Sequence, residues 1–101
     1  MLYSQTSIHS EHAARYLQSL CRHFSRKVPA KWDERSGEVN FIMGDCLFER
    51  SAQKSELVLT CSAVDNEKLS TVRSILEQHI TMLSRREEVT IIWVDQTRTK
   101  V

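Results

Sequence analysis

The chain has 101 residues, a net charge of +1 and 41% hydrophobic residues, the composition of one ordinary globular domain rather than of a disordered or strongly basic chain. It contains no apolar run near the ~20 residues that span a bilayer and no signal segment, so we expect a cytoplasmic protein without membrane contact. With two glycines and one proline it has little room for linkers, and we expect one α+β domain over residues 1–95 with a frayed tail at 96–101.

The first elements in chain order are a strand and an amphipathic helix. Residues 2–9 alternate and include several β-compatible side chains, which predicts a strand. Ser10 offers an N-cap oxygen to the helix that follows, and Pro29 ends that helix because the residue before a proline avoids the α region. The apolar spacing predicts which residues of this helix are buried: Ala13, Tyr16, Leu17, Leu20, Cys21 and Phe24.

A period of two replaces the helical pattern between residues 30 and 64. Four short runs in this region predict strands: 30–34, 37–43, 46–51 and 56–64. Ser36-Gly37 and Gly44-Asp45 stand where tight turns are needed, and glycine supplies positive φ at such positions. Strands joined by hairpins form an antiparallel sheet.

A second helix and a last strand complete the chain. Asp65 or Asn66 is expected to cap this helix. Its predicted apolar stripe consists of Leu69, Val72, Leu76, Ile80 and Leu83, widened by Ile75 and Met82. The β-branched run at 89–94 predicts a final, well-buried strand.

The predicted order is therefore β-α-β-β-β-β-α-β. Two helices with one apolar stripe each must cover one face of the antiparallel sheet, which gives a two-layer α+β sandwich. Two topologies are compatible with this pattern: a strongly curved sheet with both helices in its concavity, and a TATA-binding-protein-like arrangement. The pattern alone does not rank them.

Polar residues on the two helices form the candidate binding site. On a helical wheel, His12 and His23 fall beside the apolar stripe of the first helix, and Arg15 adjoins them. His79 lies within the stripe of the second helix, where the structural alternative is a core-edge histidine with one satisfied nitrogen. Arginine binds carboxylates and phosphates, and histidine adds pH dependence. If both helices cover the same sheet face, an anion site could be formed by His12, Arg15, Tyr16, His23, His79 and Arg86.

Several other chemistries are disfavoured. His12 and His23 stand roughly 16 Å apart along the helix and cannot share a metal ion, so we expect no metal and no cofactor. The three cysteines lack a CxxC spacing and are expected to be reduced and buried. No nucleophile elbow occurs, so no catalytic residue is assigned. Basic residues gather in 11–31 whereas 32–67 is acidic, which argues against nucleic-acid binding.

A series of short motifs resembles a bacterial family, the domain of unknown function 2218 family. The motifs are His12-x-x-Arg15-Tyr16, Leu20-Cys21-x-His23-Phe24, Gly37-x-Val39-x-Phe41, Gly44-x-Cys46, His79 and the run from Arg86 to Trp93. The chain departs from the family pattern in "MLSRREE", where a phenylalanine is expected before the arginine. The resemblance implies an α+β bacterial domain without an assigned activity. Family members occur near or fused to siderophore-interacting flavoprotein reductases, which implies a role linked to iron or siderophore metabolism.

The leading hypothesis is thus a small binding or accessory domain for an anionic ligand or a partner protein. The second is a homo-oligomeric interaction protein that dimerises through an edge strand such as residues 2–9. The third is a small enzyme that uses His12 or His23 as a general base. We expect a binding domain rather than an enzyme.

Overall fold

The computed structural model describes residues 1–51, 55–84 and 89–96, which form six strands and two helices. In chain order these are β1 (Leu2–His9), α1 (Ala13–Phe24), β2 (Ala30–Trp32), β3 (Ser36–Asn40), β4 (Asp45–Ser51), β5 (Glu56–Ala63), α2 (Asn66–Leu83) and β6 (Val94–Gln96). The predicted order of elements is confirmed. Neither described helix is both long and apolar enough to cross a membrane.

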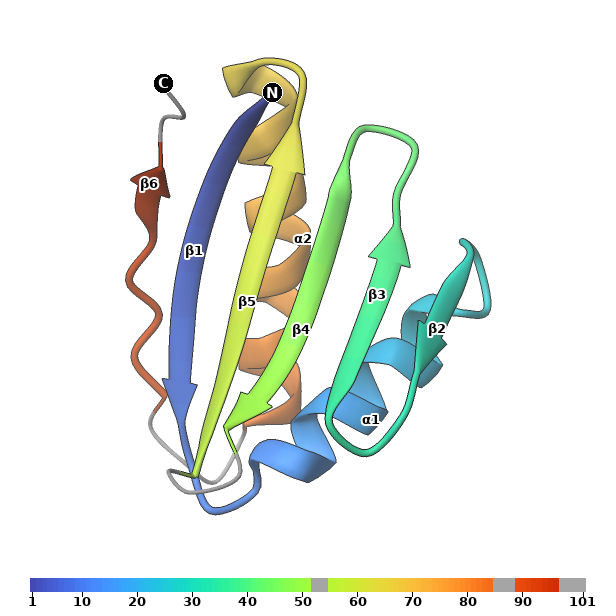
Figure 1. Ribbon diagram of the computed structural model, residues 1–101, viewed down its shortest axis with the longest axis vertical. Helices are drawn as coiled ribbons and strands as arrows, with labels where there is room; N and C mark the ends of the chain where they lie inside the picture. Colours follow the sequence, from blue (N-terminus) through green and yellow to red (C-terminus); the bar gives the residue numbers. More distant parts are fainter. Residues whose placement is uncertain (52–54, 85–88, 97–101) are drawn as a thin grey trace.

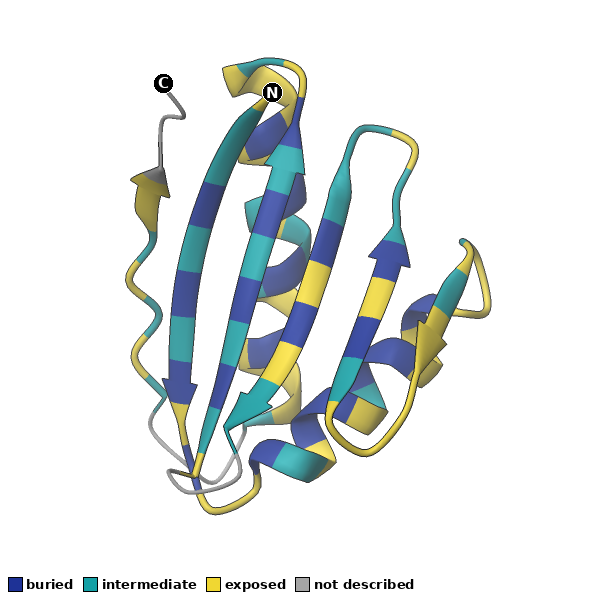
Figure 2. Cartoon of the chain, in the orientation of Figure 1, coloured by how far each residue is buried: buried dark blue, intermediate teal, exposed yellow. Residues whose placement is uncertain are grey.

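The six strands form one antiparallel sheet in the order β2-β3-β4-β5-β1-β6, and both helices lie on the same side of it (Figure 1). Helix α1 packs on β2 to β5, and α2 packs on β5 and β1. Buried and more exposed residues alternate along the central strands, because one face meets the helices and the other meets solvent (Figure 2). The predicted two-layer α+β architecture is confirmed.

Strand β1 is not an edge of the sheet, contrary to the dimer hypothesis drawn from the sequence. It pairs with β5 over its whole length, from Leu2 opposite Ala63 to His9 opposite Glu56. On its other side β6 pairs with the three residues from Tyr3 to Gln5. The edge strands of the described sheet are therefore β2 and β6, and β6 borders β1 at these three residues.

The last strand differs from the prediction in extent and in burial. Regular pairing is confined to Val94–Gln96, and the side chains of Ile92 and Val94 are 68% and 59% exposed. Ile91 and Trp93, which alternate with them, pack against the core. The prediction of a well-buried strand was wrong because β6 lies at an edge, with helices over one of its faces only.

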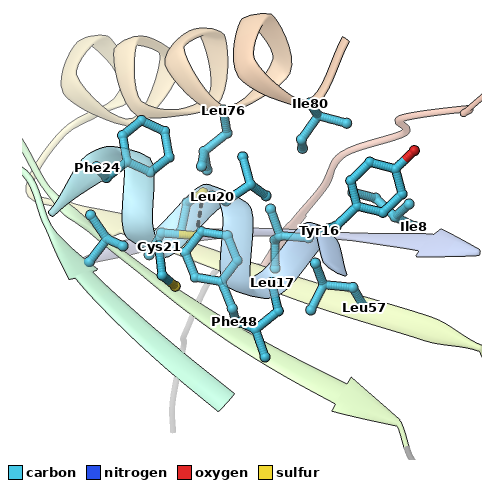
Figure 3. Packing of buried hydrophobic residues seen from close by; sticks show 14 of the residues in the cluster. Ile8, Tyr16, Leu17, Leu20, Cys21, Phe24, Phe48, Leu57, Leu76 and Ile80 are labelled. Atoms are coloured by element: carbon cyan, nitrogen blue, oxygen red, sulfur yellow. Dashed lines mark hydrogen bonds between the residues drawn. The ribbon is translucent and has the colours of Figure 1, made fainter. Parts of the chain in front are cut away.

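The helix stripes meet in one core. All six residues predicted for α1 are buried in the core cluster, and Figure 3 labels five of them beside residues of α2 and of the sheet. Leu69, Val72, Leu76 and Ile80 of α2 are buried as predicted. Met82 and Leu83, which were also predicted for this stripe, are exposed instead, so the buried stripe of α2 ends at Ile80.

The two glycines serve close packing, not positive φ. Gly37 lies within β3 rather than in a turn, and a Cβ there would lie 2.6 Å from Sγ of Cys21 on α1. Gly44 does lie at the β3–β4 turn, but a Cβ there would collide with the carbonyl oxygen of Ser62. The turn prediction was therefore wrong for Gly37. Because Gly37 has no side chain, α1 can approach β3 closely at this position.

The helix starts differ in how closely they follow the sequence. The Ser10 hydroxyl accepts a hydrogen bond from the His12 amide, but regular helix begins only at Ala13. In α2 the Asp65 carboxylate accepts a hydrogen bond of 2.8 Å from the Lys68 amide, which is the expected N-cap geometry.

Candidate functional site

The structure brings together two of the predicted site residues, His23 on α1 and His79 on α2. Their ring centroids lie 4.6 Å apart, and the ring planes are tilted by 52°. His23 is exposed and His79 is half-buried. We call these two residues the histidine pair.

The histidine pair belongs to a cluster of rings from three parts of the fold. The Phe24 ring lies 4.7 Å from the His79 ring and 5.1 Å from the ring of Phe41, in the turn after β3. Phe24 is the last buried residue of the α1 stripe, so its packing on the core fixes where the neighbouring His23 emerges. The amphipathic pattern of α1 thus positions the pair at the junction of α1, α2 and the β3–β4 turn.

His79 has different surroundings at its two ring nitrogens. Nδ1 lies 2.8 Å from the carbonyl oxygen of Ile75, one turn earlier in α2. A carbonyl can only accept, so Nδ1 carries the proton and Nε2 is the acceptor of the neutral ring. The structural role considered for His79 therefore occupies Nδ1. No described residue is shown bonded to Nε2, which could donate to an anion only if the ring carried a proton on both nitrogens.

Two hollows adjoin the histidine pair, and both are lined by His23 and His79. The apolar hollow has a volume of about 270 Å³, and besides the pair and Lys27 its walls are Phe24, Val28, Phe41, Ile42, Met43 and Ile75. The basic hollow has a volume of about 180 Å³, and besides the pair its walls are Ser19, Leu20, Arg22, Arg26, Met82 and Leu83. The pair is thus a shared border between two surfaces of different chemistry.

The electrostatics of this region favour negative charge. Arg22, Arg26 and Lys27 line the hollows, and among the residues that the structure describes no Asp or Glu side chain lines either of them. Partial loss of hydration lowers the pKa of His23, and the nearby His79, Arg26 and Lys27 lower it further. An anion in the basic hollow would oppose that positive field and favour protonation of His23.

Three other predicted site residues do not reach the histidine pair. His12 is exposed at the start of α1, and the 12-residue helix separates it from His23. Arg15 is exposed and borders a shallow depression that shares Ser19 and Arg22 with the basic hollow. Tyr16 is 5% exposed and belongs to the core (Figure 3). Arg86 lies outside the described residues.

Sequence reasoning did not include several residues that line the hollows. Arg22 and Arg26 follow the polar side of α1, so their helical spacing beside His23 was a usable signal. Phe41 and Met43 were predicted to lie within a strand over residues 37–43, whereas they lie in the β3–β4 turn beside α1 and α2. Their position depends on how the turn packs against the helices, which alternation along one strand does not report.

A metal site is not supported by the described part of the chain. There, no three His, Cys, Asp or Glu side chains are placed so that they could hold one metal ion. The cationic neighbours of the histidine pair would also oppose binding of a divalent cation.

Comparisons with known proteins support the fold and leave the site unassigned. A family model described as "Uncharacterized protein conserved in bacteria (DUF2218)" matches residues 5–94. No curated protein matches the chain. The NMR structure of PA4090 from Pseudomonas aeruginosa is similar with a TM-score of 0.76 and 21% sequence identity, over 93% of this chain and 96% of that one. At this identity the similarity concerns the fold.

Proposed function

We propose a function for this chain, which belongs to the DUF2218 family of uncharacterised proteins conserved in bacteria, from the geometry of its histidine pair. The protein is a small binding domain, and its ligand is an anion held at His23, His79 and the basic hollow. The observation that carries the proposal is the convergence of two imidazoles from different helices, 4.6 Å apart, beside cationic side chains.

The charge of the lining residues supports an anion over a cation. Arg22 and Arg26 both border the basic hollow, and Lys27 stands at the entrance to its neighbour. A guanidinium group offers paired donors that match the two oxygens of a carboxylate or phosphate. Within the described part of the chain no carboxylate joins either lining, so no acidic neighbour there competes with a ligand for these donors.

The chemistry of α1 supports binding over nucleophilic catalysis. Cys21 is fully buried on the apolar face of α1, and burial raises the pKa of its thiol to about 11. A thiol of that pKa stays protonated at neutral pH and is a poor nucleophile. His12, one of the two general bases considered, stands at the opposite end of α1 from the histidine pair.

The family resemblance extends the proposal to iron or siderophore metabolism. Many ferric siderophore complexes and haem carry carboxylate or other anionic groups that Arg22, Arg26 and His23 would recognise. These compounds therefore belong among the probes beside simple anions. The family resemblance is the reason to include iron compounds among the probes. The positive charges that line the hollows are the reason to expect that an anion binds.

Isothermal titration of the whole chain tests the proposal. The probes are inorganic phosphate, ferric citrate, a ferric catecholate siderophore and haem. We expect at least one to bind with a Kd below about 1 mM, a free energy of ~4 kcal/mol. The double variant Arg22→Gln/Arg26→Gln should weaken that binding by at least about tenfold, because two charge-assisted contacts are lost.

A matched double variant controls for net charge. Lys31→Gln/Arg35→Gln removes two positive charges from exposed residues that do not line the hollows, so affinity should stay within about twofold of the parent chain. If no probe binds below about 1 mM, or if both double variants lose the same affinity, the histidine pair is not an anion site.

A further inference from the structure

The two hollows differ in chemistry although they share a border. Their common lining residues are His23 and His79, so a molecule that lies across the histidine pair contacts both. Small-molecule sites usually occupy roughly 300–1,000 Å³. Neither hollow reaches that size alone, at about 270 and 180 Å³, so a ligand of that size would have to extend from one hollow past the histidine pair toward the other.

The lining of the apolar hollow includes aromatic rings as well as aliphatic side chains. Phe24 and Phe41 meet edge to face with ring centroids 5.1 Å apart, and the His79 ring lies 4.7 Å from Phe24. Phe24 is only 6% exposed, so the ring surface open to a ligand comes mainly from Phe41 and His79, which are both half-buried. Planar aromatic groups pack favourably on both, through offset stacking and edge-to-face contact.

Exposed apolar side chains stand at the rims of both hollows. Ile42, at the tip of the β3–β4 turn, is 99% exposed beside the apolar hollow. Met82 and Leu83 are 51% and 44% exposed beside the basic hollow. One exposed apolar residue needs no explanation, but several around a cationic pocket indicate that part of the ligand is apolar.

From this geometry we infer that the ligand is a small amphipathic anion, an aromatic carboxylate; this inference rests on the proposed anion site. The aromatic part lies in the apolar hollow against Phe24, Phe41 and Met43. The carboxylate lies across the histidine pair and is bound by Arg22 and Arg26. A purely inorganic anion would leave the apolar hollow in water, and a neutral hydrocarbon would leave the arginines unused.

Binding of four probes to the parent chain, followed by titration and by chemical-shift changes at Phe41 and Ile42, tests the inference. The probes are 2-naphthoate, acetate, inorganic phosphate and neutral 2-naphthol. We expect 2-naphthoate to bind at least tenfold more tightly than acetate, which has the same head group, and than 2-naphthol, which has the same rings.

Two variants separate the parts of the site. Ile42→Ser should weaken 2-naphthoate several-fold and leave phosphate unchanged, and it removes a side chain that contributes no burial in the folded chain. Val64→Ser changes another exposed apolar residue, one that lines neither hollow, and should change neither affinity. Arg22→Gln/Arg26→Gln should weaken 2-naphthoate and phosphate alike and leave 2-naphthol unchanged.

The failures are distinguishable. If phosphate or acetate binds as tightly as 2-naphthoate, the aromatic inference is overturned and the anion site stands. If 2-naphthol binds as tightly as 2-naphthoate and phosphate does not bind, the anion site itself is overturned. If the chain binds phosphatidylglycerol vesicles but not 2-naphthoate, the surface recognises a membrane and the small-molecule inference is wrong.

Discussion

At the scale of single residues, the two members of the histidine pair are held in different ways. His79 is tied by Nδ1 to the Ile75 carbonyl and packed against Phe24, so its ring is oriented without a ligand. His23 is exposed, and its ring contacts Phe24 and His79. A ring that is already oriented loses less conformational entropy when a ligand binds. We therefore expect His79 to keep its orientation on binding and the exposed His23 to adjust.

His23 should make anion binding dependent on pH. Its pKa is lowered in the free chain, chiefly by partial loss of hydration and then by positive neighbours, so the ring is mainly neutral at pH 7. A bound anion favours the charged ring and raises that pKa. Affinity should therefore increase as pH falls from 7.5 to 5.5, by about fivefold if binding raises the pKa by about one unit.

The groups that face His23 define the controls for this measurement. They are His79 on α2 and Arg22, Arg26 and Lys27 on or just after α1. Titration of phosphate or 2-naphthoate at several pH values should show a shallower slope in His23→Gln than in the parent chain. An affinity that is flat or rises with pH would contradict the assignment.

The lowered pKa of His23 has the opposite effect on folding stability, which should decrease as the pH falls. A folded-state pKa below the unfolded value of 6.5 means that the unfolded chain takes up the proton more readily. The contribution of His23 to stability is thus present above pH 6.5 and is lost as pH falls through the folded value. Acidification should slightly lower the stability of the free chain while it tightens anion binding.

At the scale of elements, the contact between α1 and β3 sets how closely the two layers approach. Gly37→Ala adds a methyl group 2.6 Å from Cys21 Sγ and 3.2 Å from Leu17 Cδ1, both on α1. Overpacking of this kind costs about 1–3 kcal/mol. Urea unfolding of Gly37→Ala should show a loss of this size, and Ser36→Ala, next to it, should stay within about 0.5 kcal/mol of the parent.

A double variant tests whether Cys21 is the colliding partner. Cys21→Ala removes the nearest atom, although the 3.0 Å contact with Cβ of Trp32 remains. In the Cys21→Ala background, Gly37→Ala should therefore cost less than in the parent chain, with a coupling of about 0.5–3 kcal/mol. Additive costs would mean that the helix does not approach the strand in solution as it does here.

The same contact explains what sequence patterns could predict at this scale. Periodicity identified every buried residue of α1, and cap preference narrowed the cap of α2 to Asp65 or Asn66, because both features depend on neighbours in the same helix. The role of Gly37 depends on the distance from another element, and the exposure of Val94 depends on β6 lying at an edge. Alternation and turn propensity predict neither the distance between α1 and β3 nor the position of β6 at the sheet edge.

The candidate site was predictable to a similar degree. Helical spacing placed His23 and His79 beside apolar stripes, which is where they lie. It also grouped His12 with them, but the two ends of α1 border different surroundings. Which end of α1 meets α2 follows from how the helices cross over the sheet, and that is set by the complete core.

At the scale of the whole molecule, one continuous core joins both helices to the sheet. The radius of gyration is 12.9 Å, close to the ~13 Å expected for a compact chain of about 100 residues. The three cysteines lie in this core at 0% exposure: Cys21 on α1, and Cys46 and Cys61 opposite each other on β4 and β5. They are natural reporters of whether the layers separate together or one at a time.

Thiol labelling should follow global unfolding. Burial raises the pKa of Cys21 to about 11 and that of Cys46 well above its usual value, and only the thiolate reacts. With an aromatic disulfide reagent at pH 8, we expect no labelling of the native chain. In guanidinium chloride all three cysteines should react, and each should release one aromatic thiol from the reagent. At intermediate denaturant, all three should be labelled at one rate, because they share a core.

The order of labelling is the decisive readout. Cys21 lies at the contact between the α1 layer and the sheet, whereas the Sγ atoms of Cys46 and Cys61 lie 3.8 Å apart within the sheet layer. Mass spectrometry of digested samples gives each rate, and Cys21→Ala should leave the other two rates equal to each other. Labelling of Cys21 ahead of that pair would show that α1 detaches while the sheet persists. Because α1 carries His23, the ligand site would then open with it, and a bound anion should slow the labelling of Cys21 alone.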